Sequence, residues 1–145
     1  MTCRITLSLI QESLTGDVGN DWAYSVRADM LDPMVFGSGT ILVPEHLLRP
    51  GTAQPPPSQG RAIQLDAGDC GTEVRVRLTL EATEVDFFVD DHGSNVLVVP
   101  VECPAPGGEP YTIEVDIAAR VKEAPGFQGG VAELRVKVKL VGRCV

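Results

Sequence analysis

Hydrophobic and polar residues alternate with a period of two along most of the chain, and no long stretch repeats at helical spacing. The clearest run is 73–83, in which every even-numbered residue is apolar and every odd-numbered residue is polar or charged. Such alternation is typical of a strand with one buried face. Similar runs cover 5–9, 24–30, 113–121 and 132–140. Shorter apolar runs at 40–43, 62–65 and 96–101 predict three more strands, which makes eight.

Glycine and proline fall mostly between these runs, where they favour turns and prevent one strand from continuing into the next. The proline-rich piece 44–60 is typical of a stiff connector, with room for one short helical turn at Leu47 and Leu48. Eight short strands with one apolar face each, separated by regular turns, predict an all-β chain. We therefore expect residues 1–145 to form a single domain, an eight-stranded antiparallel β-sandwich.

The formal net charge of −8 disfavours attraction to a phosphate backbone, so we expect no nucleic-acid partner. The first residues alternate between polar and apolar, whereas a signal peptide needs an unbroken apolar stretch. The longest apolar run, 96–101, is too short to span a bilayer. These features predict a soluble, cytoplasmic protein.

The four cysteines have no metal-binding spacing, and the only histidines are His46 and His92, so a zinc site is not predicted. Cys3 and Cys144 share the phase of the apolar residues in their runs, and we expect both to face the core. Free buried thiols are the favoured interpretation, because disulfides are scarce in reducing compartments. A bridge between the termini, with a second pair formed by Cys70 and Cys103, remains the alternative.

Two acidic segments, 16–24 and 84–95, lie between strand runs and contain glycine and asparagine. Carboxylates crowded on short turns repel one another unless a cation lies among them, and calcium prefers oxygen ligands in flexible geometry. A solvated acidic turn is the simpler alternative. The sequence predicts a Ca²⁺ site with candidate ligands Asp17, Asp21, Glu84, Asp86, Asp90 and Asp91.

The joint layout of these segments resembles that of C2-type domains. In the run 17–26 an Asp, a Gly, a second Asp and a following Tyr lead into a strand, as in the first loop of that family, and 84–91 resembles its later acidic loop. The chain departs from the family at Glu84, where Asp is usual, and at Trp22, where Pro is common. The resemblance implies a C2-like sandwich that holds calcium between loops at one end, through Asp17, Asp21, Asp86 and either Asp90 or Asp91. It does not by itself imply phospholipid binding.

No common catalytic motif is present, and His92 beside two aspartates is more typical of a solvated turn than of a general base, so we expect no enzyme. Arg135, Lys137 and Lys139 share one strand face, as do Arg75 and Arg77, which suggests a basic docking face or edge protection. A membrane surface is a possible partner but not the favoured one.

Two functions remain. The first is a calcium-binding module that binds or assembles with a protein partner. The second is a structural subunit of a shell, fibre or decoration layer, which would self-assemble through apolar loops at 33–36 and Phe127 without needing a metal.

Overall fold

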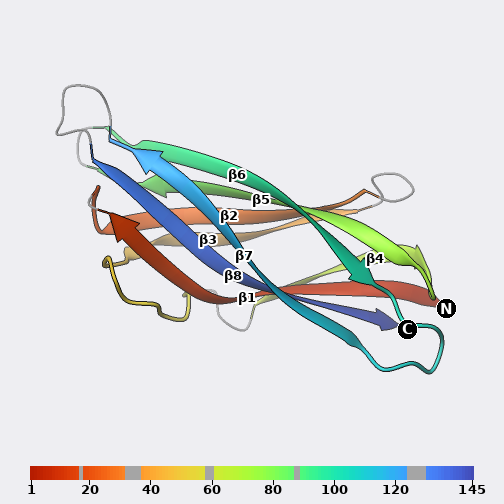
Figure 1. Ribbon diagram of the computed structural model, residues 1–145. Coiled ribbons are helices and arrows are strands. Elements are labelled where there is room, and N and C mark those ends of the chain that lie inside the picture. Colours follow the sequence, from red (N-terminus) through yellow and green to blue (C-terminus); the bar gives the residue numbers. More distant parts are fainter. Residues whose placement is uncertain (17, 32–36, 58–60, 87–88, 124–129) are drawn as a thin grey trace.

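The computed structural model describes residues 1–16, 18–31, 37–57, 61–86, 89–123 and 130–145, and within these ranges it contains eight strands and no helix (Figure 1). Accordingly, no described segment is a helix that could cross a membrane. The strands are β1 (Thr2–Gly16), β2 (Asp21–Met30), β3 (Ser38–Leu47), β4 (Ala62–Asp69), β5 (Glu73–Glu84), β6 (Asp91–Glu102), β7 (Tyr111–Lys122) and β8 (Val131–Cys144). Each contains one of the eight predicted runs and extends beyond it. The helical turn considered at Leu47 and Leu48 is wrong, since β3 continues through Leu47.

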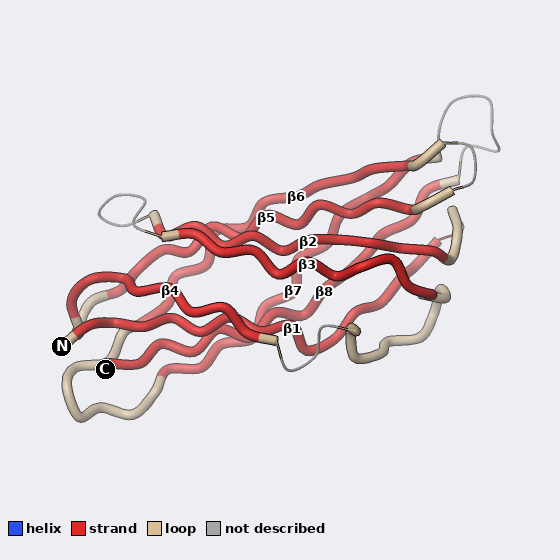
Figure 2. The backbone as a smooth tube through the Cα atoms, turned by 180° about the vertical axis from the view of Figure 1, so that it is seen from behind, coloured by secondary structure: helices blue, strands red, loops and turns tan. Residues whose placement is uncertain are grey.

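The strands form two four-stranded antiparallel sheets, ordered β4-β1-β8-β7 and β3-β2-β5-β6. The two sheets lie face to face, as Figures 1 and 2 show from opposite sides, and the predicted antiparallel β-sandwich is confirmed. The sheets approach each other at β6 and β7, where the Asn95 side-chain amide donates to the Ala118 carbonyl at 2.8 Å. A Cβ on Gly93 would overlap the Arg120 carbonyl at the same crossing, so this approach requires glycine.

The core lies between the sheets and follows the predicted strand phases. In β5 all five even-numbered apolar residues of the predicted run are buried, and Leu78 is completely so. In β8 the buried positions are likewise the apolar ones, including Leu134 and Val136 at 0% exposure. Because side chains alternate between the two faces of a strand, each sheet contributes one apolar face to a single buried cluster.

A β-bulge in β1 changes which of its side chains face the core. The register with β8 shifts between Leu9 and Gln11, so one extra residue is accommodated on β1. Leu7 and Leu9 face inward before the shift, whereas Glu12 and Leu14 face inward after it. The bulge therefore turns a carboxylate into the core at a position that regular alternation would leave outside.

The expectation of free thiols is wrong. Cys3 is joined to Cys103 and Cys70 to Cys144, so all four cysteines are in disulfides. The first bridge links β1 to the residue that follows β6 and so ties the two sheets together. The terminal cysteines do face each other, since Cys3 and Cys144 are register partners, but they are not bonded to each other. Cys3 is buried as predicted, whereas Cys144 is only half-buried.

The basic residues do not form one docking face. Arg135, Lys137 and Lys139 lie on β8 and Arg75 and Arg77 on β5, which belong to different sheets. Both strands are interior to their sheets, so these charges do not protect an edge. The β8 charges also have acidic neighbours: Glu114 and Asp116 of β7 face Lys139 and Lys137, and Arg135 contacts Glu133 at 2.9 Å.

Candidate metal site at the acidic end

The two acidic segments meet at the end of the sandwich opposite the chain termini (Figure 1). Asp21 begins β2, Glu84 ends β5 and Asp91 begins β6, and these three strands are neighbours in one sheet. Glu84 is paired with Trp22 on one side and with Asp91 on the other. The backbone amide of Val85 donates to the Asp21 carbonyl at 2.8 Å, which fixes the first segment against the second.

Three carboxylates converge at this end. One oxygen from each of Glu84, Asp86 and Asp91 lies within 4.8 Å of the others. The turn between β5 and β6 is braced internally, since the Asp86 amide donates to an Asp90 carboxylate oxygen at 3.0 Å. Strand pairing and this turn therefore hold acidic side chains close together, although like charges at such distances repel.

Glu84 is the unusual member of this group because it is buried. Its residue number has the parity of the inward-facing residues of β5, and it is only 5% exposed. Its Oε2 atom has no hydrogen-bond partner. Among the described residues, it is the one buried side-chain oxygen or nitrogen of which this is true. A Cβ on Gly19 would overlap the Glu84 carboxylate, so the glycine of the first segment makes room for it. A buried carboxylate oxygen without a donor is costly, and a cation would satisfy it.

The electrostatics of the cluster disfavour a charged Glu84. Burial, followed by the charges of Asp86, Asp91, Asp21 and Asp90, raises the pKa of Glu84 to about 7. All four of these neighbouring charges are carboxylates. The same four groups thus lie near enough to Glu84 to act on its charge, and together with it they form what we call the acidic cluster: Asp21, Glu84, Asp86, Asp90 and Asp91.

Three of the six residues that the sequence predicted as ligands, Glu84, Asp86 and Asp91, converge within 4.8 Å, and the charges of Asp21 and Asp90 act on Glu84 from the same end of the sandwich. Asp17, the sixth, lies outside the described residues. Glu84 and Asp91 are buried, whereas Asp21, Asp86 and Asp90 are exposed. All the ligand atoms that these side chains offer are oxygens. Calcium and magnesium prefer oxygen ligands, whereas softer metals prefer thiolates.

A second polar group, centred on Glu12, was missed by the sequence reasoning. The Glu12 carboxylate, at 0% exposure, accepts hydrogen bonds from the Tyr24 hydroxyl at 2.8 Å and from the Gln54 amide at 2.9 Å. The Nε2 atom of His46 lies 2.6 Å from the same carboxylate, and its Nδ1 atom lies 2.8 Å from the Pro44 carbonyl. Burial and the adjacent Glu12 charge raise the pKa of Tyr24. This group links both sheets to the connector after β3. The sequence does not predict it, because Glu12 faces inward only as a result of the β-bulge in β1.

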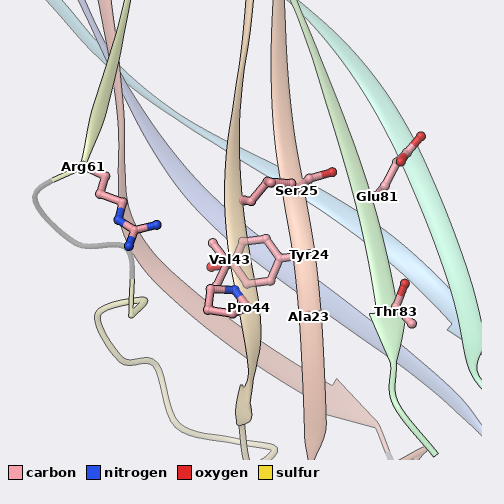
Figure 3. A pocket seen from close by; sticks show the side chains of 9 residues that line it. Ala23, Tyr24, Ser25, Val43, Pro44, Arg61, Glu81 and Thr83 are labelled. Carbon is pink, nitrogen blue, oxygen red and sulfur yellow. The ribbon is translucent and has the colours of Figure 1, made fainter.

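A hollow of about 490 Å³ lies over β2, β3 and β5, away from the inward-facing carboxylates (Figure 3). Its lining includes Leu42 and Pro44 of β3, and its charged members are Arg61, just before β4, and Glu81 of β5. Figure 3 shows the Arg61 side chain directed toward Val43 and Pro44. The hollow is shallow and open, and its two charges have opposite signs, so it lacks the convergent polar groups of a small-molecule site.

Comparison with protein-family models and with curated proteins matched no family and no protein.

Proposed function

We propose that this chain is a calcium-binding β-sandwich module whose ion is held by the acidic cluster. The observation that carries the proposal is Glu84, whose Oε2 atom is buried without a partner among four further carboxylates. Without a cation this arrangement combines an unsatisfied buried oxygen with repulsion between like charges. A divalent cation removes both costs at once.

Calcium fits the donor set better than the alternatives. Calcium accepts six to eight oxygens in irregular geometry, and the cluster supplies them from two buried and three exposed carboxylates, to which carbonyls and water can add. Magnesium demands an almost ideal octahedron and retains most of its water, which a partly buried cluster disfavours. The resemblance to C2-type domains is consistent with this proposal, and because many families share the sandwich architecture, membership stays a prediction.

The module would act through the end that the ion orders. The cluster joins the ends of β2, β5 and β6, so a bound ion crosslinks three chain segments at one end of the sandwich. Loops at the end of a rigid sandwich are where such folds bind partners. We propose a protein partner at this end, bound more tightly when calcium is present, and no catalytic role.

The disulfides change the expected compartment. The cytoplasmic expectation came from the alternating first residues and the short apolar runs, whereas two disulfides favour an oxidising location. Thiol counting under denaturing, non-reducing conditions decides between them: no reactive thiols are expected, and four would restore the cytoplasmic expectation.

Calcium should stabilise the fold, and Asp86→Asn should reduce this effect. A ligand that binds only the native state stabilises it by about 2.7 kcal/mol when its concentration is a hundredfold above its dissociation constant. We expect thermal melts in calcium and in chelator to differ accordingly for the parent chain. In Asp86→Asn the difference should shrink, while the melt in chelator stays unchanged or improves because one repelling charge is gone.

Glu102→Gln is the matched control for that experiment. It removes one exposed carboxylate from β6, at the end of the strand remote from Asp91. Its response to calcium should equal that of the parent chain. Equal melts of the parent chain in calcium and in chelator would contradict the proposal.

In chelator, stability should fall as the pH rises through neutrality. The folded-state pKa of Glu84 is raised to about 7, so the native state binds a proton that the unfolded state has already released. The associated stability is complete below the unfolded-state pKa of about 4.3 and is lost as the pH rises through about 7, by on the order of 3 kcal/mol. Urea denaturation at pH 5 and pH 8 measures this loss. In Glu84→Gln the free energy of unfolding should fall less between pH 5 and pH 8 than in the parent chain. An equal fall in both proteins would assign the pH dependence to other groups.

A structural subunit is the second candidate, and exposed apolar residues favour it. Leu42 on β3 and Val96 and Val98 on β6 are 67%, 53% and 45% exposed, on the two edge strands of one sheet. The apolar loops at 33–36 and Phe127, which the sequence suggested for this role, lie outside the described residues. Size-exclusion chromatography over a range of concentrations tests self-assembly. A larger species that forms equally in calcium and in chelator would favour this candidate.

A further inference from the structure

The first half of β7 has a free edge. β6 and β7 lie together at the end that carries the acidic cluster and diverge toward the termini (Figure 1). Asn95 of β6 contacts Ala118 of β7, whereas the end of β6 lies over β8, where a Cβ on Gly142 would overlap the Glu102 carbonyl. Among the described strands, β7 pairs only with β8. β6 therefore approaches the second half of β7, and residues 111–116, which we call the open edge, extend beyond it.

The core is incompletely covered where the two strands diverge. The inward-facing side chains of β7 are buried from Ile117 onward, whereas those of the open edge are only half-buried. Most of the half-buried apolar side chains that pack against the core, among the described residues, come from this region of β6 and β7: Leu97, Tyr111, Ile113 and Val115. An additional strand beside the open edge would shield these side chains from water.

The backbone of the open edge is oriented to pair with such a strand. In an antiparallel sheet the N–H and C=O of one residue point to the same side, and successive residues point to opposite sides. The carbonyls of Ala118 and Arg120 face β6 and not β8. Because the β7–β8 register continues without a shift, the N–H and C=O of Thr112, Glu114 and Asp116 also point away from β8. No other described strand pairs with them.

Two other edge strands, by contrast, carry features that prevent pairing. On β6 the Val96 amide donates to the side-chain oxygen of Asn95 at 2.8 Å, and Pro100 has no amide hydrogen. On β3 Pro44 lies within a register shift against β2. Residues 111–116 contain no proline, glycine or register shift. The open edge therefore lacks the usual protection against strand addition.

We infer that the open edge binds an extended segment of a protein partner, which pairs antiparallel with β7 and alternates apolar with basic residues. Addition of a strand to a sheet edge is a common mode of peptide recognition, in which main-chain hydrogen bonds supply affinity and alternate side chains supply specificity. The apolar residues of the segment cover Ile113 and Val115. Its basic residues lie on the outer face beside Glu114 and Asp116, which are both exposed.

A second copy of this chain fits the open edge less well than a basic segment does. Two copies paired antiparallel about Glu114 would set its carboxylate directly opposite that of the second copy, and like charges in such pairs are destabilising. Each copy also carries a net charge of −8. The charge of the edge thus favours a partner of opposite sign.

A short peptide that alternates lysine with valine tests the inference on the full chain with its disulfides intact. We expect saturable binding of one peptide per chain by calorimetry, and slower hydrogen exchange at the amides of Thr112, Glu114 and Asp116 by nuclear magnetic resonance. In the inferred pairing the lysine amides donate to β7 and the valine amides face solvent. Methylation of the lysine amides should therefore weaken binding by at least about tenfold, because several hydrogen bonds are lost. Methylation of the valine amides is the matched control and should leave the affinity unchanged.

The contribution of charge is tested by a peptide with glutamate in place of lysine. It should bind more weakly than the lysine peptide, and the double variant Glu114→Gln/Asp116→Asn should narrow the difference between the two. Circular dichroism should show that this variant keeps its strand structure.

Several results would overturn the inference. These are no binding of the lysine peptide, equal affinities of the two methylated peptides, and slowed exchange only at amides outside the open edge. Slowed exchange at the open edge that depends on protein concentration, without peptide, would assign the edge to a second copy instead. Binding should be the same in calcium and in chelator, and the same in Asp86→Asn. Peptide binding that required calcium would place the peptide at the acidic cluster.

Discussion

Glu12→Ala should destabilise the fold by about 3–5 kcal/mol, the loss typical of removing one partner from a buried charged group. Glu12 is fully buried, and its carboxylate contacts Tyr24 of β2, His46 of β3 and Gln54 of the connector. Alanine would leave these three polar groups without their partner and open a cavity where the two sheets meet. Urea denaturation of the parent chain and the variant measures the difference.

Tyr24→Phe provides the graded comparison for this experiment. It removes one hydrogen bond to Glu12 and leaves the others, so a loss of about 1–2 kcal/mol is expected. If Glu12→Ala proved no more costly than Tyr24→Phe, Glu12 would not be the centre of this polar group.

Leu78→Ala should cost about 2–4 kcal/mol through the lost transfer free energy and the cavity left behind. Leu78 is fully buried in β5, an interior strand with neighbours on both sides. Lys137→Ala is the surface control and should cost less than about 0.5 kcal/mol. Arg77→Ala should fall between them, because Arg77 contacts the buried carboxylate of Asp29 at 3.4 Å. A control more sensitive than Leu78→Ala would mean that the strand phase is wrong by one residue.

The sandwich was predictable because its physical cause is local. Sheets that bury one face each require period-two alternation, and each of the eight apolar runs marks a real strand. What could not be predicted depends on pairing between distant residues. The bulge in β1 is visible only as a register shift against β8, and the acidic neighbours of Lys137 and Lys139 come from β7. Asp29 has the parity of the polar face, yet is 3% exposed and contacts Arg27 and Arg77.

The candidate site was predictable in its residues and not in its arrangement. The acidic turns are apparent in the sequence, and the parity of Glu84 already places it with Leu78 and Leu80 on the inner face of β5. The Oε2 atom of Glu84 is buried without a hydrogen-bond partner because β5 pairs with β2 and β6 and because Gly19 lies against the carboxylate. The spacing of residues in the sequence does not reveal these contacts. The cysteine partners likewise depend on which strand ends meet.

Terbium luminescence is the most direct test of calcium binding by the acidic cluster. Trp22, the only tryptophan, is buried and paired with Glu84 across β2 and β5, so excited indole should sensitise a terbium ion bound in the calcium site. We expect saturable emission that calcium displaces, strongly weakened in Glu84→Gln and unchanged in Glu102→Gln. Absence of sensitised emission from the folded parent chain, or equal emission from Glu84→Gln, would contradict calcium binding by the acidic cluster.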